Sequence, residues 1–218
     1  MSHFADGAVY EGDWKDDKKE GEGRFVFANG VEYSGGWADG EVHGQGRYVY
    51  ASGNVYIGSF ERGKRHGFGT VTLADGSSFE GDWRDGDMHK GVYKFAENGI
   101  EYDGEWKNGK RDGKGCYKYK NGDIYVGDFK DDKKHGIGET KFANGTVFKG
   151  EFIDGRRNGP GKVVFTDGRS YANEWVMGKE AGERHWVMGE PSKTAALATP
   201  AAVPPASSRA HPQTGTRM

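Results

Sequence analysis

The sequence holds one cysteine, Cys116, so the chain cannot close a disulfide within itself. It also lacks any apolar run near the roughly 18 residues that a membrane-spanning helix needs. Its first residues, MSHFADGAVY, do not show the basic-then-apolar pattern of a secretory signal. We therefore expect a cytoplasmic protein, and any contact that it makes with a membrane to be peripheral.

The chain also has no large excess of either positive or negative charge. The 31 Lys and Arg residues nearly balance the 33 Asp and Glu residues, which gives a formal net charge of −2. This balance offers no general reason to expect nucleic acid as a partner. Glycine is abundant, at 38 of 218 residues, yet aromatic residues make up 13% of the chain and fall at fixed intervals. A chain that never buries surface would not need such spacing.

The intervals are those of a 23-residue repeat. We number the positions of each copy from its first aromatic residue, position 0, which is Tyr10, Tyr33, Tyr56, Phe79, Tyr102, Tyr125, Phe148 or Tyr171. A second aromatic stands at position +4, in Trp14, Trp37, Phe60, Trp83, Trp106, Phe129, Phe152 and Trp175. Glycines occupy positions +2, +11 and +13 in most copies. The last copy has Asn173 at +2 instead.

Spacing by two and frequent glycine both favour strands over helices. Each repeat is then a hairpin, with a first strand such as 10–15, a turn over 16–20 and a second strand over 21–27. This register pairs position 0 with +15, +2 with +13 and +4 with +11, all on one face of the sheet. The fourth unit departs from the pattern, because Gly91 stands between Lys90 and Val92 at the two glycine positions. We expect a local bulge or kink there.

Two segments carry a family resemblance: Tyr-Glu-Gly-Asp-Trp at 10–14, and Gly63-Lys64-Arg65-His66-Gly67-Phe68-Gly69. Both resemble the membrane occupation and recognition nexus, or MORN, repeat, and copies in phase extend over roughly residues 4 to 188. The resemblance implies an all-β fold, an elongated, twisted, single-layer antiparallel sheet of tandem hairpins, and similarity to radial-spoke head and junctophilin-type arrays. We expect an array over residues 1–190, with seven full repeats from Tyr10 and partial terminal repeats, and a disordered Pro/Ala/Ser-rich tail over 191–218.

Two patterns imitate ligand sites. The segments 58–64 and 104–110 read G-x-x-x-x-G-K, like a phosphate-binding loop, but Arg65 and Arg111 stand where Ser or Thr should follow, and no helix is expected after them. Four histidines at position +10 recur two strands apart, about 9.6 Å, which is too far for one zinc ion. We expect no catalytic residue, no metal and no cofactor.

Pairs of basic residues recur at positions +8 and +9, in the expected turn. We expect them along one long edge of the sheet, where they are candidates for contact with acidic phospholipids; protection of the edge from strand pairing is the structural alternative. These residues are Lys18, Lys19, Lys64, Arg65, Lys110, Arg111, Lys133, Lys134, Arg156 and Arg157.

The aromatic face is the other candidate surface, because no helix in the sequence is available to cover it. A sheet of seven or eight hairpins is long enough to hold an extended or helical partner segment. The alternative is that the rings pack mainly against their own glycines. The candidate groove residues are Tyr10, Trp14, Tyr33, Trp37, Tyr56, Phe60, Trp83, Tyr102, Trp106, Tyr125 and Phe129.

We therefore expect a non-catalytic protein-interaction scaffold in a cytoskeletal, ciliary or flagellar assembly, the setting resting on family analogy alone. A peripheral membrane tether and an accessory subunit of a separate enzyme are the alternatives. In each of these three roles, the chain could also act as a homodimer.

Overall fold

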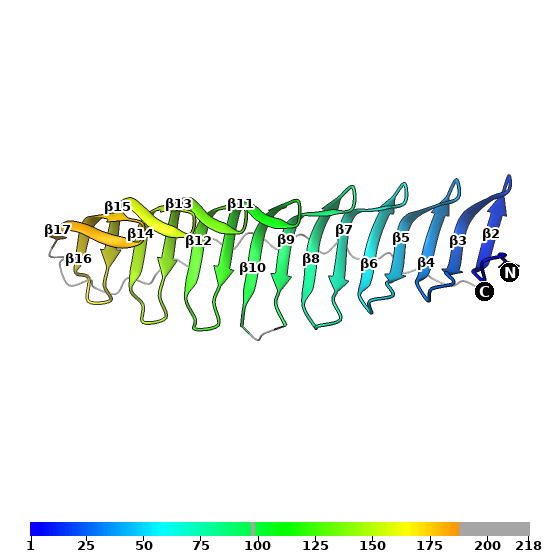
Figure 1. Cartoon of the computed structure of the whole chain (residues 1–218), viewed down its shortest axis with the longest axis horizontal. Coiled ribbons are helices and arrows are strands. Elements are labelled where there is room, and N and C mark those ends of the chain that lie inside the picture. The colour runs from blue at the N-terminus through cyan, green and yellow to red at the C-terminus, as the bar shows by residue number, and fades with distance from the viewer. Residues whose placement is uncertain (97–98, 188–218) are drawn as a thin grey trace, which may run out of the picture.

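The computed structural model describes residues 1–96 and 99–187, and the predicted tail lies outside them. These residues form one open, elongated, antiparallel sheet in a single layer (Figure 1). Each strand pairs with its neighbour along the chain, from β1 (Ser2–His3) to β17 (Lys179–Val187). The all-β hairpin array predicted from the sequence is confirmed.

The first strands of the repeats are seven residues long. They are β2 (Val9–Lys15), β4 (Glu32–Ala38), β6 (Val55–Glu61), β8 (Ser78–Arg84), β10 (Glu101–Lys107), β12 (Ile124–Lys130), β14 (Val147–Ile153) and β16 (Ser170–Val176). The second strands that complete these hairpins are β3 (Lys18–Val26), β5 (Glu41–Val49), β7 (Lys64–Thr72), β9 (Asp87–Lys94), β11 (Lys110–Lys118), β13 (Lys133–Lys141), β15 (Arg156–Val164) and β17.

The turn inside each hairpin is shorter than the sequence predicted. It contains two residues, such as Asp16 and Asp17 with φ values of 48° and 59°, and the second strand starts at Lys18 instead of residue 21. Two successive positive φ values give a turn whose twist matches that of the flanking strands. The predicted turn over 16–20 was therefore too long.

The predicted register is correct in two of its three pairs. Tyr10 faces Phe25 and Gly12 faces Gly23, but Trp14 faces Lys19 within its own hairpin, not Gly21. A bulge causes this shift, and Gly21 lies in it with a φ of 71°. The equivalent pairing of +4 with +11 occurs between neighbouring repeats, where Gly21 faces Trp37.

The fourth unit keeps the sheet continuous. In the third unit, two steps along the chain from Gly58 to Phe60 lie opposite four steps from Gly69 to Arg65. In the fourth unit, one step from Asp82 to Trp83 lies opposite two steps from Lys90 to Met88. Its bulge thus holds one extra residue instead of two. The predicted irregularity is present: β9 is one residue shorter than β7, which makes the bulge smaller without breaking the pairing of Gly81 with Gly91.

Candidate functional site: the ring face

Aromatic rings at positions 0 and +4 form a ladder along one face, which we call the ring face. From Trp37 to Phe152, each +4 ring meets edge-on the position 0 ring of its own repeat and that of the repeat before. Trp83, for example, lies 5.2 Å from both Tyr56 and Phe79 between ring centroids. Edge-to-face contacts of this kind stabilise by about 0.5–1.5 kcal/mol beyond the buried area. The ladder is the core of a sheet that has no second layer.

Ten of the eleven predicted groove residues are buried in this ladder. They are Tyr10, Tyr33, Tyr56, Tyr102, Tyr125, Trp37, Phe60, Trp83, Trp106 and Phe129, each at most 8% exposed. The other one, Trp14, is 44% exposed, because no earlier repeat supplies a ring on its outer side. The structure thus brings the predicted rings together, but mostly against one another.

Glycine at positions +2 and +13 makes room for the position 0 ring. A Cβ atom on Gly104 would lie 2.5 Å from the Tyr102 hydroxyl oxygen and 2.7 Å from the Cα atom of Gly115. No side chain fits at such distances. The inference that glycines provide space for the rings holds at these positions, while glycines at +11 provide the positive φ of the bulge.

Polar atoms of the ladder bond to the backbone. The Tyr56 hydroxyl donates to the carbonyl oxygen of Ser59 at 3.0 Å, and the Trp83 indole Nε1 donates to the carbonyl oxygen of Gly69 at 3.0 Å. Burial raises the pKa of Tyr56 to about 12, so its hydroxyl stays protonated at neutral pH. The irregular fourth unit interrupts this bonding: the buried Nε1 atom of Trp106 has no partner among the described residues.

The dibasic pairs split between two surfaces, which corrects the prediction that both members line the edge. Successive strand residues point to opposite faces. The +8 side chains, which are those of Lys18, Lys64, Lys110, Lys133 and Arg156, are exposed, whereas the +9 side chains of Lys19, Arg65, Arg111, Lys134 and Arg157 are half-buried on the ring face. Three +8 lysines meet a carboxylate on the next turn, as Lys110 meets Asp131 at 3.0 Å.

The +9 side chains lie over aromatic rings. The ammonium of Lys19 is 4.1 Å from the centroid of Phe25, and the guanidinium carbon of Arg65 is 4.1 Å from that of Trp83. Lys134 lies 4.7 Å from the ring of Tyr125, and Arg157 lies 4.3 Å from the ring of Phe148. Such contacts contribute about 0.5–2 kcal/mol each. They also place a row of positive charge beside the rings.

A row of apolar side chains at position +17 was missed as a candidate surface. These side chains are half-buried and pack beside the ladder: Phe27, Tyr50, Leu73, Phe95, Tyr119, Phe142 and Phe165. Each of them directly follows a second strand and lies beside the +15 side chain of that strand, as Tyr119 lies beside Tyr117 with 4.5 Å between ring centroids. Their recurrence at 23 residues, with a shift of one in the fourth unit, was the signal that could have identified them.

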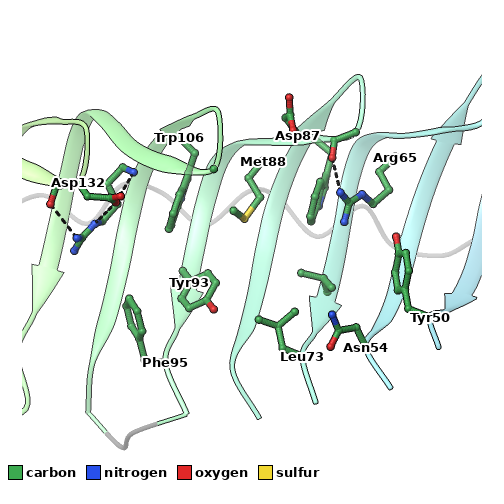
Figure 2. Close-up of a pocket in the computed structure, with 15 residues that line it drawn as sticks. Tyr50, Asn54, Arg65, Leu73, Asp87, Met88, Tyr93, Phe95, Trp106 and Asp132 are labelled. Atoms are coloured by element: carbon green, nitrogen blue, oxygen red, sulfur yellow. Dashed lines mark hydrogen bonds and ion pairs between the residues drawn. The ribbon is translucent and has the colours of Figure 1, made fainter. Parts of the chain in front are cut away.

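A pocket of about 640 Å³ opens on the ring face around the irregular fourth unit. Met88 and Tyr93 lie at its centre, Leu73 and Phe95 lie at one long edge, and Arg65 lies toward one end (Figure 2). Met88 occupies the +9 position that is basic in five other repeats. At this unit the ring face therefore carries an apolar side chain in place of a cation, as it does at Val42 in the second repeat.

The other patterns of the sequence lie in strands and turns. Segments 58–64 and 104–110 run from a first strand through its two-residue turn to the start of the second strand, which is not the geometry of a phosphate-binding loop. Across residues 1–96 and 99–187, no group of three His, Cys, Asp or Glu side chains is placed to hold a metal ion. Nor does any helix there have the length and apolarity to cross a membrane.

Lys134 is expected to be more reactive toward amine reagents than its neighbour Lys133. Burial, together with repulsion from Arg157, lowers the pKa of Lys134 to about 8, so that a large fraction of the amine is unprotonated near that pH. Labelling with an N-hydroxysuccinimide ester across pH 6 to 10, followed by peptide mass spectrometry, measures both lysines. A midpoint for Lys134 near 10 would contradict its partly desolvated position.

Two kinds of similarity agree with this geometry. A family model described as the MORN repeat matches residues 10–32, 33–55, 56–78, 79–100, 102–124, 125–147 and 148–168. No curated protein matches the sequence.

Among solved structures, the G-box domain of the microcephaly protein CPAP, described as suggesting a role in centriole elongation, is similar with a TM-score of 0.54 and 12% identity, over 87% of this chain and 97% of that one. The TCP domain of SAS-4 from Drosophila melanogaster, solved with a proline-rich motif, gives 0.42 and 14%, over 70% and 77%. The TCP10 domain of Danio rerio CPAP, solved with a peptide of STIL, gives 0.30 and 13%, over 87% and 92%.

At 12% identity, the likeness to the CPAP G-box domain concerns the fold, an open sheet of consecutive hairpins. The family model is more specific, because its seven matches are consecutive and coincide with the observed hairpins. The chain belongs to the MORN repeat family.

Proposed function

We propose that this protein is a non-catalytic scaffold that holds an extended or helical segment of a partner protein along the ring face. The observation that carries the proposal is the +17 row, whose half-buried side chains run beside the buried ladder. At the fourth unit, Leu73 and Phe95 of this row line the pocket. Rings that are already ordered lose little conformational freedom on binding, which favours affinity. The predicted groove then acts mainly through this row, with the ladder as its support.

The dimensions of the sheet support a long contact. Seventeen strands at about 4.8 Å spacing extend over roughly 75 Å, the length of an extended segment of more than 20 residues. A shorter segment would lie across the pocket, where apolar side chains of the partner would meet Leu73, Met88 and Phe95. The sheet offers such a segment contacts spread over several repeats.

The setting that we propose is a cytoskeletal assembly such as a cilium or a centriole-related structure. Fold analogy with the CPAP G-box domain supports this setting, as does the family resemblance to radial-spoke head arrays. An accessory role beside a separate enzyme would use the same ring face, so the identity of the captured partner decides between the two.

The test compares the two faces of one sheet. Tagged protein and the variants Leu73→Asp and Ile57→Asp are used for affinity purification from ciliated cells, and bound proteins are quantified by mass spectrometry. Leu73 is half-buried on the ring face, whereas Ile57 is 56% exposed on the opposite face. Both variants replace an apolar residue by aspartate, so they add the same charge to different faces. Circular dichroism confirms folding of each variant.

We expect Leu73→Asp to remove most of the specific partner and Ile57→Asp to leave it in place. Each apolar anchor at an interface contributes about 1–3 kcal/mol, and a buried charge would raise that loss. Equal capture by all three proteins would show that the partner binds elsewhere. Loss only with Ile57→Asp would assign the function to the opposite face.

Binding of acidic phospholipids at the +8 edge stays a prediction. Sedimentation with phosphatidylserine vesicles tests it, comparing the native protein with Lys64→Glu/Arg156→Glu, two exposed +8 residues that form no ion pair within the described chain. Membrane tethering predicts sedimentation that the double variant loses. Native protein that stays in the supernatant would exclude the tether under these conditions.

A further inference from the structure

The basic residues on the ring face differ from those on the edge in how their charge is balanced. Across residues 1–96 and 99–187, Lys19, Arg65, Lys134 and Arg157 form no ion pair and lie against aromatic rings. The guanidinium of Arg65 also donates to the carbonyl oxygen of Gly86 at 2.6 Å. Arg111 is the exception, since its Nε atom lies 3.0 Å from a carboxylate oxygen of Asp132. Four charges on this face are thus held without a carboxylate partner.

The strand positions around them supply almost no acid. The eight residues at position +9 are Lys19, Val42, Arg65, Met88, Arg111, Lys134, Arg157 and Glu180. Glu180 is the one acid among them, and it is already engaged by the Tyr171 hydroxyl at 2.5 Å and by Arg184 at 2.8 Å. The +9 row is therefore positive over most of its length.

Burial makes these charges costly in the free protein. Desolvation lowers the pKa of Lys19, of Arg157 and, with repulsion from Arg157, of Lys134. A partly desolvated cation is stabilised when a carboxylate approaches it, because the attraction is less screened than in water. A partner segment bearing carboxylates would supply the missing counter-charges.

The spacing of the row defines the partner further. Lys134 and Arg157 stand in successive repeats, whose equivalent strands are about 9.6 Å apart. We propose that the segment held on the ring face is acidic, with carboxylate side chains about 10 Å apart over Lys134 and Arg157 and apolar side chains against the +17 row. A segment in the polyproline II conformation presents every third residue on the same side at about this distance, because it has three residues per turn and rises about 3.1 Å per residue. The inference rests on the proposed function, since it specifies the chemistry of the same partner.

A protein segment fits this row better than a lipid surface does. The +9 side chains are recessed among rings, whereas the +8 side chains that a flat membrane would meet first are exposed and in three repeats paired with carboxylates. A peptide can insert between the +9 and +17 rows. Binding to acidic vesicles instead of the peptide is therefore the competing outcome of the test.

The experiment uses the full chain and a fluorescein-labelled peptide with Glu at every third position and Leu or Phe between. Affinity is measured by fluorescence anisotropy for native protein, Lys134→Gln/Arg157→Gln and Lys133→Gln/Arg156→Gln. The two double variants change the same net charge at adjacent residues that point to opposite faces. A third variant, Arg111→Gln, removes a ring-face charge that Asp132 already compensates. A peptide of equal composition with its Glu residues in one block tests the spacing.

We expect the Lys134→Gln/Arg157→Gln variant to bind the spaced peptide about tenfold or more weakly, since close charge pairs at interfaces couple by at least about 1.5 kcal/mol. The edge variant and Arg111→Gln should change affinity much less, and the blocked peptide should bind more weakly. Equal losses in both double variants would overturn the inference, as would binding to phosphatidylserine vesicles but not to the peptide. Retained capture of the cellular partner by Lys134→Gln/Arg157→Gln would overturn it while leaving the proposed function intact.

A proton measurement gives an independent readout. The groups that act on Lys134 are Arg157 from β15, Asp123 from the turn before β12, and the phenols Tyr119 and Tyr125. A carboxylate brought to this site favours the charged amine, so binding at pH 8 should take up protons. Calorimetry in buffers of different ionisation enthalpy measures that uptake. Uptake that persists unchanged in Lys134→Gln would contradict the assignment.

Discussion

Replacing Gly104 by alanine is expected to lower the free energy of unfolding by about 3 kcal/mol, the upper range for overpacking of a filled site. The added Cβ atom would lie 2.5 Å from the Tyr102 hydroxyl oxygen and 2.7 Å from a backbone atom of Gly115. The ring cannot retreat, because Trp106 and Phe129 pack against it from two sides, at 5.1 Å and 5.0 Å between centroids.

Urea unfolding followed by circular dichroism measures the effect. Gly109→Asn is the control, because Gly109 has a φ of 74° with no atom near its Cβ direction, and asparagine tolerates that conformation. We expect the control to cost less than about 1 kcal/mol. Equal unfolding midpoints for Gly104→Ala and the native protein would show that the ring does not need the glycine beneath it.

Trp83→Ala should destabilise the array by about 3–5 kcal/mol, the range for deleting a large buried aromatic side chain. Trp83 is 3% exposed, lies between two rings and donates a hydrogen bond to Gly69. Trp14 occupies the same repeat position but is 44% exposed and contacts one ladder ring. Trp14→Ala is therefore a matched control, with an expected cost of roughly 1 kcal/mol.

Because each repeat contacts mainly its neighbours, Trp83→Ala should also split the unfolding transition. Differential scanning calorimetry would show a lower-melting component for the repeats around β8. If Trp83→Ala and Trp14→Ala lowered the melting temperature equally, position in the ladder would not determine stability.

Most of the fold could be predicted from the 23-residue period. Recurrence of Tyr10 and its equivalents established the hairpin array, and facing glycines such as Gly12 and Gly23 were predicted correctly from spacing alone. These features follow from strand alternation, which fixes which side chains share a face.

The hairpin turn was mispredicted although its signal was present. Asp39-Gly40, Asn108-Gly109 and Asp154-Gly155 are pairs typical of two-residue turns with positive φ. A two-residue turn pairs Lys15 with Lys18, and continuing that register would not bring Gly12 opposite Gly23. The observed glycine pairing therefore requires a bulge in the second strand that takes up the extra residues. The bulge also brings the +9 side chains to the ring face, which explains why the dibasic pairs were placed together on the edge.

The candidate site could be predicted in location but not in detail. Periodicity identified an aromatic face, yet it could not show that rings such as Tyr56 and Trp83 would fill their own glycine spaces. Only packing distinguishes a buried ladder ring from a half-buried ring such as Tyr50, since both recur at the same interval. The cation row depended on a bulge that spacing alone did not resolve.

The most direct measurement of the central claim, that the ring face holds the partner, is site-specific photo-crosslinking in cells. Benzoylphenylalanine is placed at Leu73 on the ring face or at Ile57 on the opposite face, and crosslinked proteins are identified by mass spectrometry. We expect one dominant protein adduct at Leu73 that is absent at Ile57. An adduct to the same protein at Ile57, with none at Leu73, would contradict it.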